Sequence, residues 1–259
     1  MAVKETVPEA GIEFKDASEI TGNKPTGFLF YGGSGSGKTE LAASFNAHDP
    51  RVNWEAAWEE KVGKVMMMDY DDGMLTVRGA PNITYHTFTE DRGRPTIYND
   101  LIRMKPKIEE LSRSGEIHTL VHDSLTTLTE ACMNQVLYST GHVGLQPTFP
   151  EWGTQMRYIQ DIIIWSLSLP VNVIMTAHEQ IQKDDTTGRV WCLPLVTGKL
   201  AQRISLYFDE VYHLESGTGK DARFQMLTRP DRIYTAKSRI GYKEAYQVTS
   251  YRTIMEAMK

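Results

Sequence analysis

The sequence has little cysteine, no excess of positive charge and no long apolar run. Its 259 residues include two cysteines, Cys132 and Cys192, and the formal net charge is −5. Two thiols this far apart lack the close spacing of paired metal ligands or of a disulfide framework, so reduced thiols and a cytoplasmic compartment are expected. The negative balance excludes a polycationic chain, and contact with nucleic acid therefore requires a local basic patch.

Signals for a membrane or for secretion are also lacking. The apolar stretch Ile162–Trp165 is far shorter than a bilayer span. Residues 1–19 are polar and acidic, unlike a secretory signal. We therefore expect no membrane contact. We also expect an arm over residues 1–24, followed by one domain with a full core over residues 25–259.

A glycine-rich segment is the most informative feature that is present. Eight residues match the phosphate-binding pattern G-x-x-x-x-G-K-[ST], and Glu40 follows them: Gly32, Gly33, Ser34, Gly35, Ser36, Gly37, Lys38 and Thr39. The apolar run Phe28–Tyr31 predicts a buried strand before the pattern, and the spacing of Leu41, Ala42 and Phe45 predicts a helix after it. In that context the glycines let several backbone N–H groups point at one anion, and the helix N-terminus adds positive potential.

This P-loop predicts that the chain binds ATP and Mg²⁺. Lys38 is expected to reach the β- and γ-phosphates, and the Thr39 hydroxyl to bind the metal ion. The alternative is a Gly/Ser-rich turn without a ligand. The Lys-Thr pair and both flanking elements argue against that alternative.

Strands and helices alternate over the first two thirds of the sequence. Apolar or alternating runs predict strands over 27–31, 64–69, 83–88, 117–122 and 171–175. Helical spacing predicts a helix after the P-loop that runs to about Asn46, and helices over 97–111, 125–138 and 156–167, with a kink or a new start at Pro106. The order predicts an α/β fold, with a mostly parallel central sheet flanked by helices. Later strands over 206–214, 223–228 and 232–238 lack intervening helices and predict an antiparallel C-terminal edge.

Three connecting segments complete the expected chain. Residues 47–63, which include Trp54 and Trp58, are expected to form a loop with a short helix. Residues 141–153 are rich in Gly and Pro and predict a loop, and residues 180–198 predict a long polar segment.

Polar side chains stand at the ends of three predicted strands, where parallel α/β sheets bind their ligands. Asp123 is expected to hold Mg²⁺, although it or Ser124 can also cap the next helix. Asp69, Asp71 and Asp72 offer a base near the attacking water, or else form a solvated acidic turn. His178 can sense the γ-phosphate, or be a structural histidine.

The ordered set of motifs resembles the RecA family of P-loop ATPases. The strand ends Met68-Asp69-Tyr70-Asp71 and Val121-His122-Asp123-Ser124 are followed by a strand that ends in a polar sensor. Tyr234–Gly241 contains a Lys-Ser-Arg triplet that is similar to the K-x-R element of RecA-like and DnaB-like ATPases. The sequence resembles most closely the phage-encoded Sak-type proteins linked to single-strand annealing, recombination and repair. The shared features are Thr176–Glu179, Gly198-Lys199, Phe208–Tyr212 and the Lys-Ser-Arg tail.

This resemblance, over about residues 25–245, implies a RecA-like P-loop fold and a role for each matching residue. Lys38 and Thr39 hold phosphate and Mg²⁺, and Asp123 completes the metal site. Asp71 takes the position of the catalytic carboxylate, which is usually Glu, with Asp69 beside it and His178 as the sensor. Lys237 and Arg239 act as fingers on the γ-phosphate of a neighbouring subunit, in a ring or filament of identical chains. The alternative is a pair of solvated cations on one face of an edge strand.

Single-stranded DNA is the further ligand that the resemblance implies, together with a recombination or annealing partner and, for a phage protein, the host cytoplasm. The expected binding loops are residues 141–153 and 180–197. The second combines Lys183 and Arg189 with Trp191, which suits charge contact and base stacking. The same loop contains Asp184 and Asp185, which oppose phosphate, and the bland alternative is an interface loop of an oligomer.

Three functions therefore remain open. The first is a DNA-stimulated ATPase. The second is an ATP-gated oligomeric scaffold with weak hydrolysis and no direct DNA role, which the shorter Asp71 side chain allows. The third is a small-molecule kinase. Such enzymes close an Arg-rich lid over the acceptor, and the sequence has no such cluster of arginines, which argues against this function.

Overall fold

The computed structural model describes residues 25–46, 64–91, 93–217 and 223–258. The arm expected over residues 1–24 and the loop with a short helix expected over 47–63 lie outside these residues. Within the described ranges, every helix is too short or too polar to cross a bilayer.

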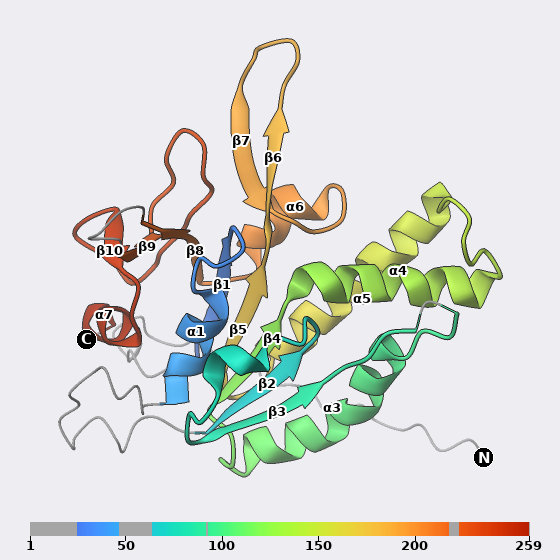
Figure 1. The fold of residues 1–259 in the computed structure, drawn as a ribbon, viewed down its shortest axis with the longest axis horizontal. Coiled ribbons are helices and arrows are strands. Elements are labelled where there is room, and N and C mark those ends of the chain that lie inside the picture. Colours follow the sequence, from blue (N-terminus) through green and yellow to red (C-terminus); the bar gives the residue numbers. More distant parts are fainter. Residues whose placement is uncertain (1–24, 47–63, 92, 218–222, 259) are drawn as a thin grey trace, which may run out of the picture.

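In the described residues, an eight-stranded sheet forms the centre of the molecule (Figure 1). Six neighbouring strands run parallel, in the spatial order β8 (Glu210–Ser216), β1 (Gly27–Gly32), β5 (Asn172–Ala177), β4 (Thr119–Asp123), β2 (Val65–Asp69) and β3 (Ile83–Thr87). Two antiparallel strands, β9 (Phe224–Leu227) and β10 (Tyr246–Val248), extend the sheet beyond β8. The predicted α/β fold, with a mostly parallel sheet and an antiparallel C-terminal edge, is confirmed.

The alternation of side chains along β1 divides the core between the two faces of the sheet. Phe28 and Phe30 face a cluster that includes residues of α1 (Lys38–Ala43), the 3₁₀ turn η2 (Ser44–Asn46) and α7 (Tyr251–Ala257). Leu29 and Tyr31 face the larger cluster, which includes α3 (Ile97–Arg113), α4 (Leu125–Thr140) and α5 (Phe149–Leu167). Burying each large apolar side chain contributes about 1.5–3 kcal/mol, so helices on both faces fix β1 and the loop that follows it.

Two helices differ from the prediction. α3 continues through Pro106 as one helix, so a new start at this residue was wrong. α5 begins at Phe149, within the segment predicted as a loop. The reason is the Glu151 carboxylate, whose Oε2 accepts hydrogen bonds from Thr148 N at 2.7 Å and Thr148 Oγ1 at 2.8 Å. This contact satisfies an otherwise unpaired donor at the helix start.

A hairpin replaces the long polar segment predicted over residues 180–198. Its strands are β6 (Glu179–Lys183) and β7 (Val190–Pro194), and it projects beyond the sheet at the top of Figure 1. Asp184 Oδ1 accepts hydrogen bonds from Thr186 N at 2.8 Å and Thr187 N at 3.1 Å, which shapes the turn. The hairpin is followed by α6 (Leu200–Arg203).

The C-terminal third follows the prediction only in part. The strand predicted from residue 206 begins at Glu210, because residues up to Leu206 form the 3₁₀ turn η4 (Ile204–Leu206). Residues 232–238, all of them described, do not form the predicted strand but make two isolated bridges, Cys192 with Tyr234 and Val211 with Lys237. β9 already pairs with β8 from His213 onward, so only a short part of that edge remains for this segment. β10 and α7 were not predicted.

Candidate nucleotide-binding site

The P-loop connects β1 to α1 at the carboxyl end of the parallel sheet. At Gly32 a Cβ atom would lie 2.2 Å from the Leu214 carbonyl oxygen on β8, so no side chain fits there. Gly37, which precedes α1, has a φ of +86°, a conformation that favours glycine. Ser34 and Gly35 are exposed at the tip, whereas Ser36 is buried and Glu40 lies half-buried in the first turn of α1. The predicted strand, glycine-rich turn and helix are all present.

The Lys38 side chain is buried under this loop. Its Nζ donates hydrogen bonds to the Gly32 carbonyl at 3.0 Å and to the Gly33 carbonyl at 2.7 Å. Burial lowers the pKa of Lys38, while the carboxylates of Asp123, Glu179 and Asp71 act in the opposite direction. The Lys38 ammonium group is therefore stabilised electrostatically by three acids, on a glycine-rich loop of the kind that binds anions.

Asp123 joins the P-loop helix to the neighbouring strands. Its Oδ2 accepts a hydrogen bond from Thr39 Oγ1 at 2.7 Å, and its Oδ1 accepts one from Thr176 Oγ1 on β5. Burial raises the pKa of Asp123, and the two hydroxyl donors counteract this effect. A buried carboxylate beside a hydroxyl is a set of hard oxygen donors, which fits Mg²⁺. Thr176 was not assigned this role from the sequence, although it begins the Thr-Ala-His-Glu segment.

Ser124, and not Asp123, caps the helix that follows β4. Ser124 is the N-cap of α4, and its Oγ accepts a hydrogen bond from Thr127 N at 3.5 Å. Asp123 itself lies at the end of β4, in register with Asp69 on β2.

Asp71 and His178 meet although they are far apart in the sequence. His178 Nε2 lies 3.8 Å from Asp71 Oδ2. Asp71 Oδ1 accepts a hydrogen bond from Thr127 Oγ1, and His178 N donates to Thr126 Oγ1 at 3.0 Å. Two threonines at the start of α4 thus position both groups, and neither threonine was singled out from the sequence. This position leaves Asp71 partly exposed and close to Lys38.

Asp69 and Asp72, the other two acids of residues 69–72, have different surroundings. The Asp69 carboxylate accepts hydrogen bonds from Asp71 N at 3.2 Å, Gly73 N at 3.1 Å and Thr87 Oγ1 at 2.8 Å. It is completely buried and shapes the turn that presents Asp71. Asp72 is exposed on this turn, at a φ of 55°.

Glu179 lies on the other flank of the P-loop and was not assigned a role from the sequence. Its Oε2 is 2.7 Å from His213 Nε2 on β8, and a Cβ atom at Gly33 would lie 3.3 Å from its Oε1. The Thr-Ala-His-Glu segment was the available signal, but only its histidine was singled out.

Lys237 and Arg239 lie near the amino ends of β8 and β1, at the opposite end of these strands from the P-loop. Lys237 Nζ donates hydrogen bonds to the carbonyl oxygens of Ser205 at 3.2 Å and Phe208 at 2.5 Å. Arg239 forms an ion pair with Asp209. Asp209 N donates a hydrogen bond to the carbonyl of Gly27 at the start of β1, and the Asp209 carboxylate accepts one from Gly27 N at 3.2 Å. The expected strand face that would carry both cations is not formed.

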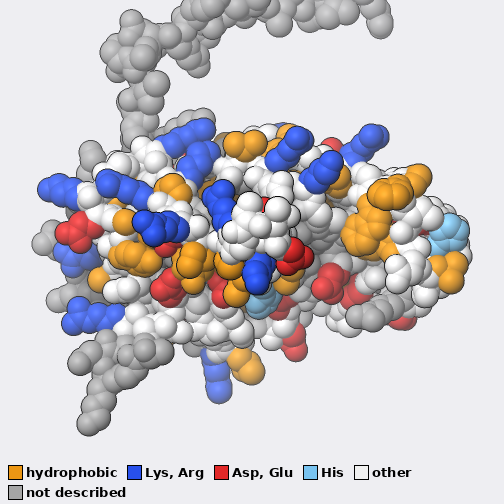
Figure 2. Space-filling view, turned by 90° about the horizontal axis from the view of Figure 1, so that it is seen from above, with side chains coloured by type: hydrophobic (Ala, Val, Ile, Leu, Met, Phe, Trp, Pro, Cys, Tyr) orange, Lys and Arg blue, Asp and Glu red, His pale blue; other side chains and the backbone are white. Residues whose placement is uncertain are grey.

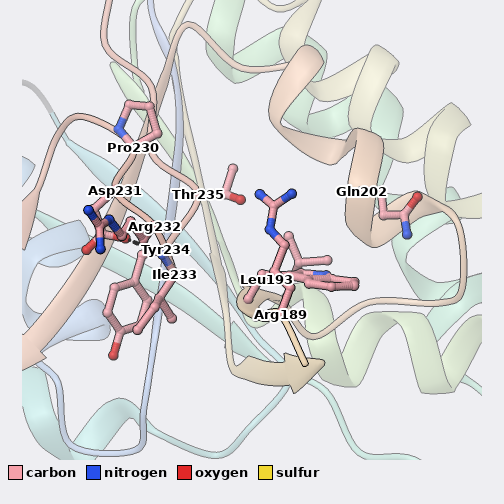
Figure 3. A pocket seen from close by; sticks show the side chains of 10 residues that line it. Arg189, Leu193, Gln202, Pro230, Asp231, Arg232, Ile233, Tyr234 and Thr235 are labelled. Atoms are coloured by element: carbon pink, nitrogen blue, oxygen red, sulfur yellow. Dashed lines mark hydrogen bonds between the residues drawn. The ribbon is translucent and has the colours of Figure 1, made fainter. Parts of the chain in front are cut away.

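Lys183, Arg189 and Trp191 all lie on the β6–β7 hairpin. The Arg189 guanidinium carbon is 5.9 Å from the centre of the Trp191 ring, and Trp191 Nε1 donates to Gln182 Oε1 at 3.0 Å. A pocket of about 370 Å³ separates this face of the hairpin from residues 230–235. Figure 3 shows the Arg189 side chain between Gln202 on one side and that segment on the other.

The surface around the hairpin is mixed in character. Figure 2 looks down on this end of the molecule and shows several Lys and Arg side chains around the centre. Apolar side chains gather at the far end, where the α4–α5 connection exposes Leu145 and 94% of Phe149. Asp184 is already bound within the hairpin turn, and the backbone donors of Thr187 and Thr186 hold its pKa below the ordinary value.

Comparison with known proteins gives one family. A family model described as an AAA domain matches residues 24–240, which is most of the chain and includes the P-loop, Asp71, Asp123, His178 and both C-terminal cations. No curated protein matches the chain.

Proposed function

The chain belongs to the AAA-domain family of P-loop ATPases, and from this premise we propose that it is a Mg²⁺-dependent, RecA-like ATPase that acts on single-stranded DNA. Membership of this family makes the chain an ATPase of the P-loop class.

The observation that supports the chemistry best is the hydrogen bond between Thr39 and Asp123 near the buried Lys38, whose charge both Asp123 and Asp71 stabilise. In the proposed site, Lys38 and the loop N–H groups bind the phosphates, while Thr39 and Asp123 would hold Mg²⁺. When bound there, Mg²⁺ would supply positive charge against the negative charge of the phosphate oxygens. Asp71 accepts a proton from the attacking water as its oxygen bonds to the γ-phosphorus, and the bond to the ADP oxygen breaks. His178, held at 3.8 Å from Asp71, is proposed to sense the γ-phosphate.

The experiment is an assay of phosphate release from ATP across protein concentration, with and without Mg²⁺. We expect Mg²⁺-dependent turnover that is lost in Asp123→Asn. Turnover per chain that rises with protein concentration supports a site completed between subunits. Equal turnover in Asp123→Asn would remove Asp123 from the metal site.

The hairpin supports the DNA part of the proposal. Arg189 over Trp191 provides a cation and a stacking surface on one face, and Lys183 is exposed on the same hairpin. Stacking on an aromatic ring contributes about 1–3 kcal/mol per base. Titration with a labelled oligonucleotide is expected to give salt-dependent binding, weaker by about tenfold or more in Trp191→Ala. Trp165→Phe, which changes a tryptophan of α5, is the matched control. If Trp191→Ala binds the oligonucleotide as tightly as the wild type, the hairpin is not the DNA-binding element.

A second function, an ATP-gated scaffold with weak hydrolysis, has one observation in its favour. Both Asp71 oxygens face other groups, with Thr127 at Oδ1 and His178 at Oδ2, so a water molecule has to compete for the carboxylate. ATP-dependent assembly without phosphate release, measured by light scattering and a phosphate assay on one sample, would favour the scaffold.

The proposed trans-acting fingers require a change of partner. Arg239 now pairs with Asp209, and Lys237 caps two carbonyls of its own chain. If Arg239 acts in a neighbouring site, Arg239→Ala mixed with Asp71→Asn restores part of the turnover, because some interfaces then combine two intact halves. If its role is structural, Arg239→Ala and Asp209→Asn lose similar stability and the mixture shows no rescue.

A further inference from the structure

We propose that Glu179, Cys192 and His213 form a binding site for a divalent transition-metal ion, with zinc as the best match. This site is separate from the oxygen-lined Thr39–Asp123 pair and does not depend on ATP turnover. Among the described residues, the three side chains bring a carboxylate oxygen, a sulfur and an imidazole nitrogen within 4.8 Å of one another.

Three different strands supply these donors. Glu179 begins β6, Cys192 lies on β7 in register with Ile181, and His213 lies on β8. β8 and β5 flank β1, and Tyr31 on β1 pairs with His213 on one side and Ala177 on the other. The hairpin begins directly after β5, so its base lies near β8 and brings Glu179 and Cys192 to His213.

The distances are close to those that a tetrahedral ion needs. His213 Nε2 is 2.7 Å and Cys192 Sγ is 3.5 Å from Glu179 Oε2. Ligands bound to one zinc ion at about 2.0–2.3 Å are themselves separated by roughly 3–4 Å. The contact between Cys192 and Glu179 lies within this range, and the contact between His213 and Glu179 has to lengthen for both groups to face one ion. Cys, His and Glu together are donors that zinc accepts readily, whereas Mg²⁺ and Ca²⁺ prefer oxygen alone.

A carboxylate lies near the second nitrogen of His213, as in the outer shell of many metal-bound histidines. His213 Nδ1 is 3.2 Å from Glu215 Oε1, but their present geometry does not make a hydrogen bond, so Glu215 has to rotate to complete the contact. Metal-binding histidines commonly direct their second nitrogen at a carboxylate, which orients the ring and makes the ligand more basic. The Tyr234 ring stacks on His213 at 3.8 Å and an angle of 16°, which restricts ring rotation further.

Burial leaves one side of the cluster open. Cys192 is 1% and His213 2% exposed, whereas Glu179 is half-buried beside Gly33 of the P-loop. Three protein ligands with one accessible side leave room for water as the fourth ligand. A bound ion would connect the base of the β6–β7 hairpin to β8, next to the phosphate-binding loop.

The test is a titration of the full-length, chelator-treated protein with Co²⁺ under a phosphine reductant, without nucleotide. Cobalt takes the place of zinc and reports thiolate ligation through a charge-transfer band. We expect one equivalent of Co²⁺ to produce this band and tetrahedral d–d absorption, and Zn²⁺ to remove both. Cys192→Ser is expected to abolish the charge-transfer band, and Glu215→Gln to weaken Co²⁺ binding about 10–100-fold.

The controls separate this site from other binding. Cys132→Ser changes the buried thiol of α4 and is expected to keep the full signal. Asp123→Asn removes the oxygen-lined site, which cannot give a thiolate band, and is expected to keep the signal as well. If the wild-type protein shows no charge-transfer band, or if the band survives in Cys192→Ser, the site does not exist. Should Cys192→Ser fail to fold, His213→Gln replaces it, and an unchanged spectrum in that variant is equally decisive.

Discussion

The two flanks of the P-loop are built from different chemistry. Toward β4, the side chains are hydroxyls and carboxylates, with Asp123 between Thr39 and Thr176 and Asp71 beside Thr127. Toward β8, Glu179 contacts the nitrogen of His213 and the sulfur of Cys192. Oxygen donors favour Mg²⁺, and the mixed set favours a softer ion such as zinc. The Lys38 ammonium group interacts with acids of both flanks, with Asp123 and Asp71 on the β4 side and with Glu179 on the β8 side.

The two flanks also differ in the elements that hold them. The residues of the β4 flank lie at the ends of strands inside the sheet, where burial restricts their movement. The β8 flank depends on the β6–β7 hairpin, which projects from the sheet (Figure 1). A ligand on the hairpin is therefore expected to influence the β8 flank first and the Asp71–Asp123 flank only indirectly.

The largest effect is expected from the residue shared by both flanks. Lys38→Ala removes the buried ammonium, and we expect nucleotide affinity to fall by more than about 100-fold and turnover to disappear. Binding of a fluorescent ATP analogue and phosphate release measure the two quantities. Lys107→Ala, which removes an exposed lysine of α3, is the control. Wild-type hydrolysis in Lys38→Ala would contradict the P-loop assignment.

The next largest effect compares the flanks directly. Asp71→Asn keeps the shape but cannot accept the proton, so turnover is expected to fall about 10²–10⁴-fold with little change in nucleotide affinity. Glu179→Gln is expected to cost about tenfold or less, because its partners are His213 and Cys192. Steady-state kinetics on both variants measure the contrast. If Glu179→Gln proves as damaging as Asp71→Asn, the chemistry cannot be assigned to the β4 flank.

A third prediction concerns the core behind the β4 flank. His122 Nδ1 is 2.8 Å from Tyr70 Oη and Nε2 is 3.0 Å from Ser166 Oγ, and burial lowers the pKa of His122 from 6.5 to about 3. Between these values the unfolded state binds more protons, so stability falls as the pH drops below about 6.5. From pH 7 to pH 5 this group alone contributes a loss of about 2 kcal/mol.

Urea unfolding at several pH values checks this prediction. His122→Gln removes the titrating group, and its stability is expected to fall less steeply than that of the wild type over the same range. Parallel slopes for the two proteins would mean that His122 does not titrate as its burial implies.

The smallest effect tests the hydroxyl support of Asp123. Thr176→Val removes one hydrogen bond to a buried carboxylate, worth about 1 kcal/mol, so the Mg²⁺ concentration for half-maximal turnover is expected to rise about fivefold. Thr129→Val, which removes a buried hydroxyl that donates to the Leu125 carbonyl within α4, is the matched control. An equal shift in both variants would point to a general loss of stability instead.

Much of the fold was predictable because short sequence patterns determine many of its strands and helices. The β1 run, the glycine-rich loop and the start of α1 each have a strong short-range signal, and so do the strands before Asp69 and Asp123. The C-terminal region was harder, because β9 covers the β8 edge that residues 232–238 were expected to join. The hairpin was missed because it depends on the turn at Asp184 and on the long-range backbone contacts of Cys192 with Ile233 and Tyr234.

The sequence by itself determined the P-loop, the strand-end acids and the α/β order, since each depends on neighbouring residues and on simple periodicity. Only the tertiary structure decided which of those acids is buried as a structural residue and which is presented at the site. Asp69 is enclosed by three donors and Asp71 is presented toward His178, because strands β2, β4 and β5 end at one edge. It also decided that Glu179, Cys192 and His213 meet, since long-range strand pairing leaves no trace in local spacing.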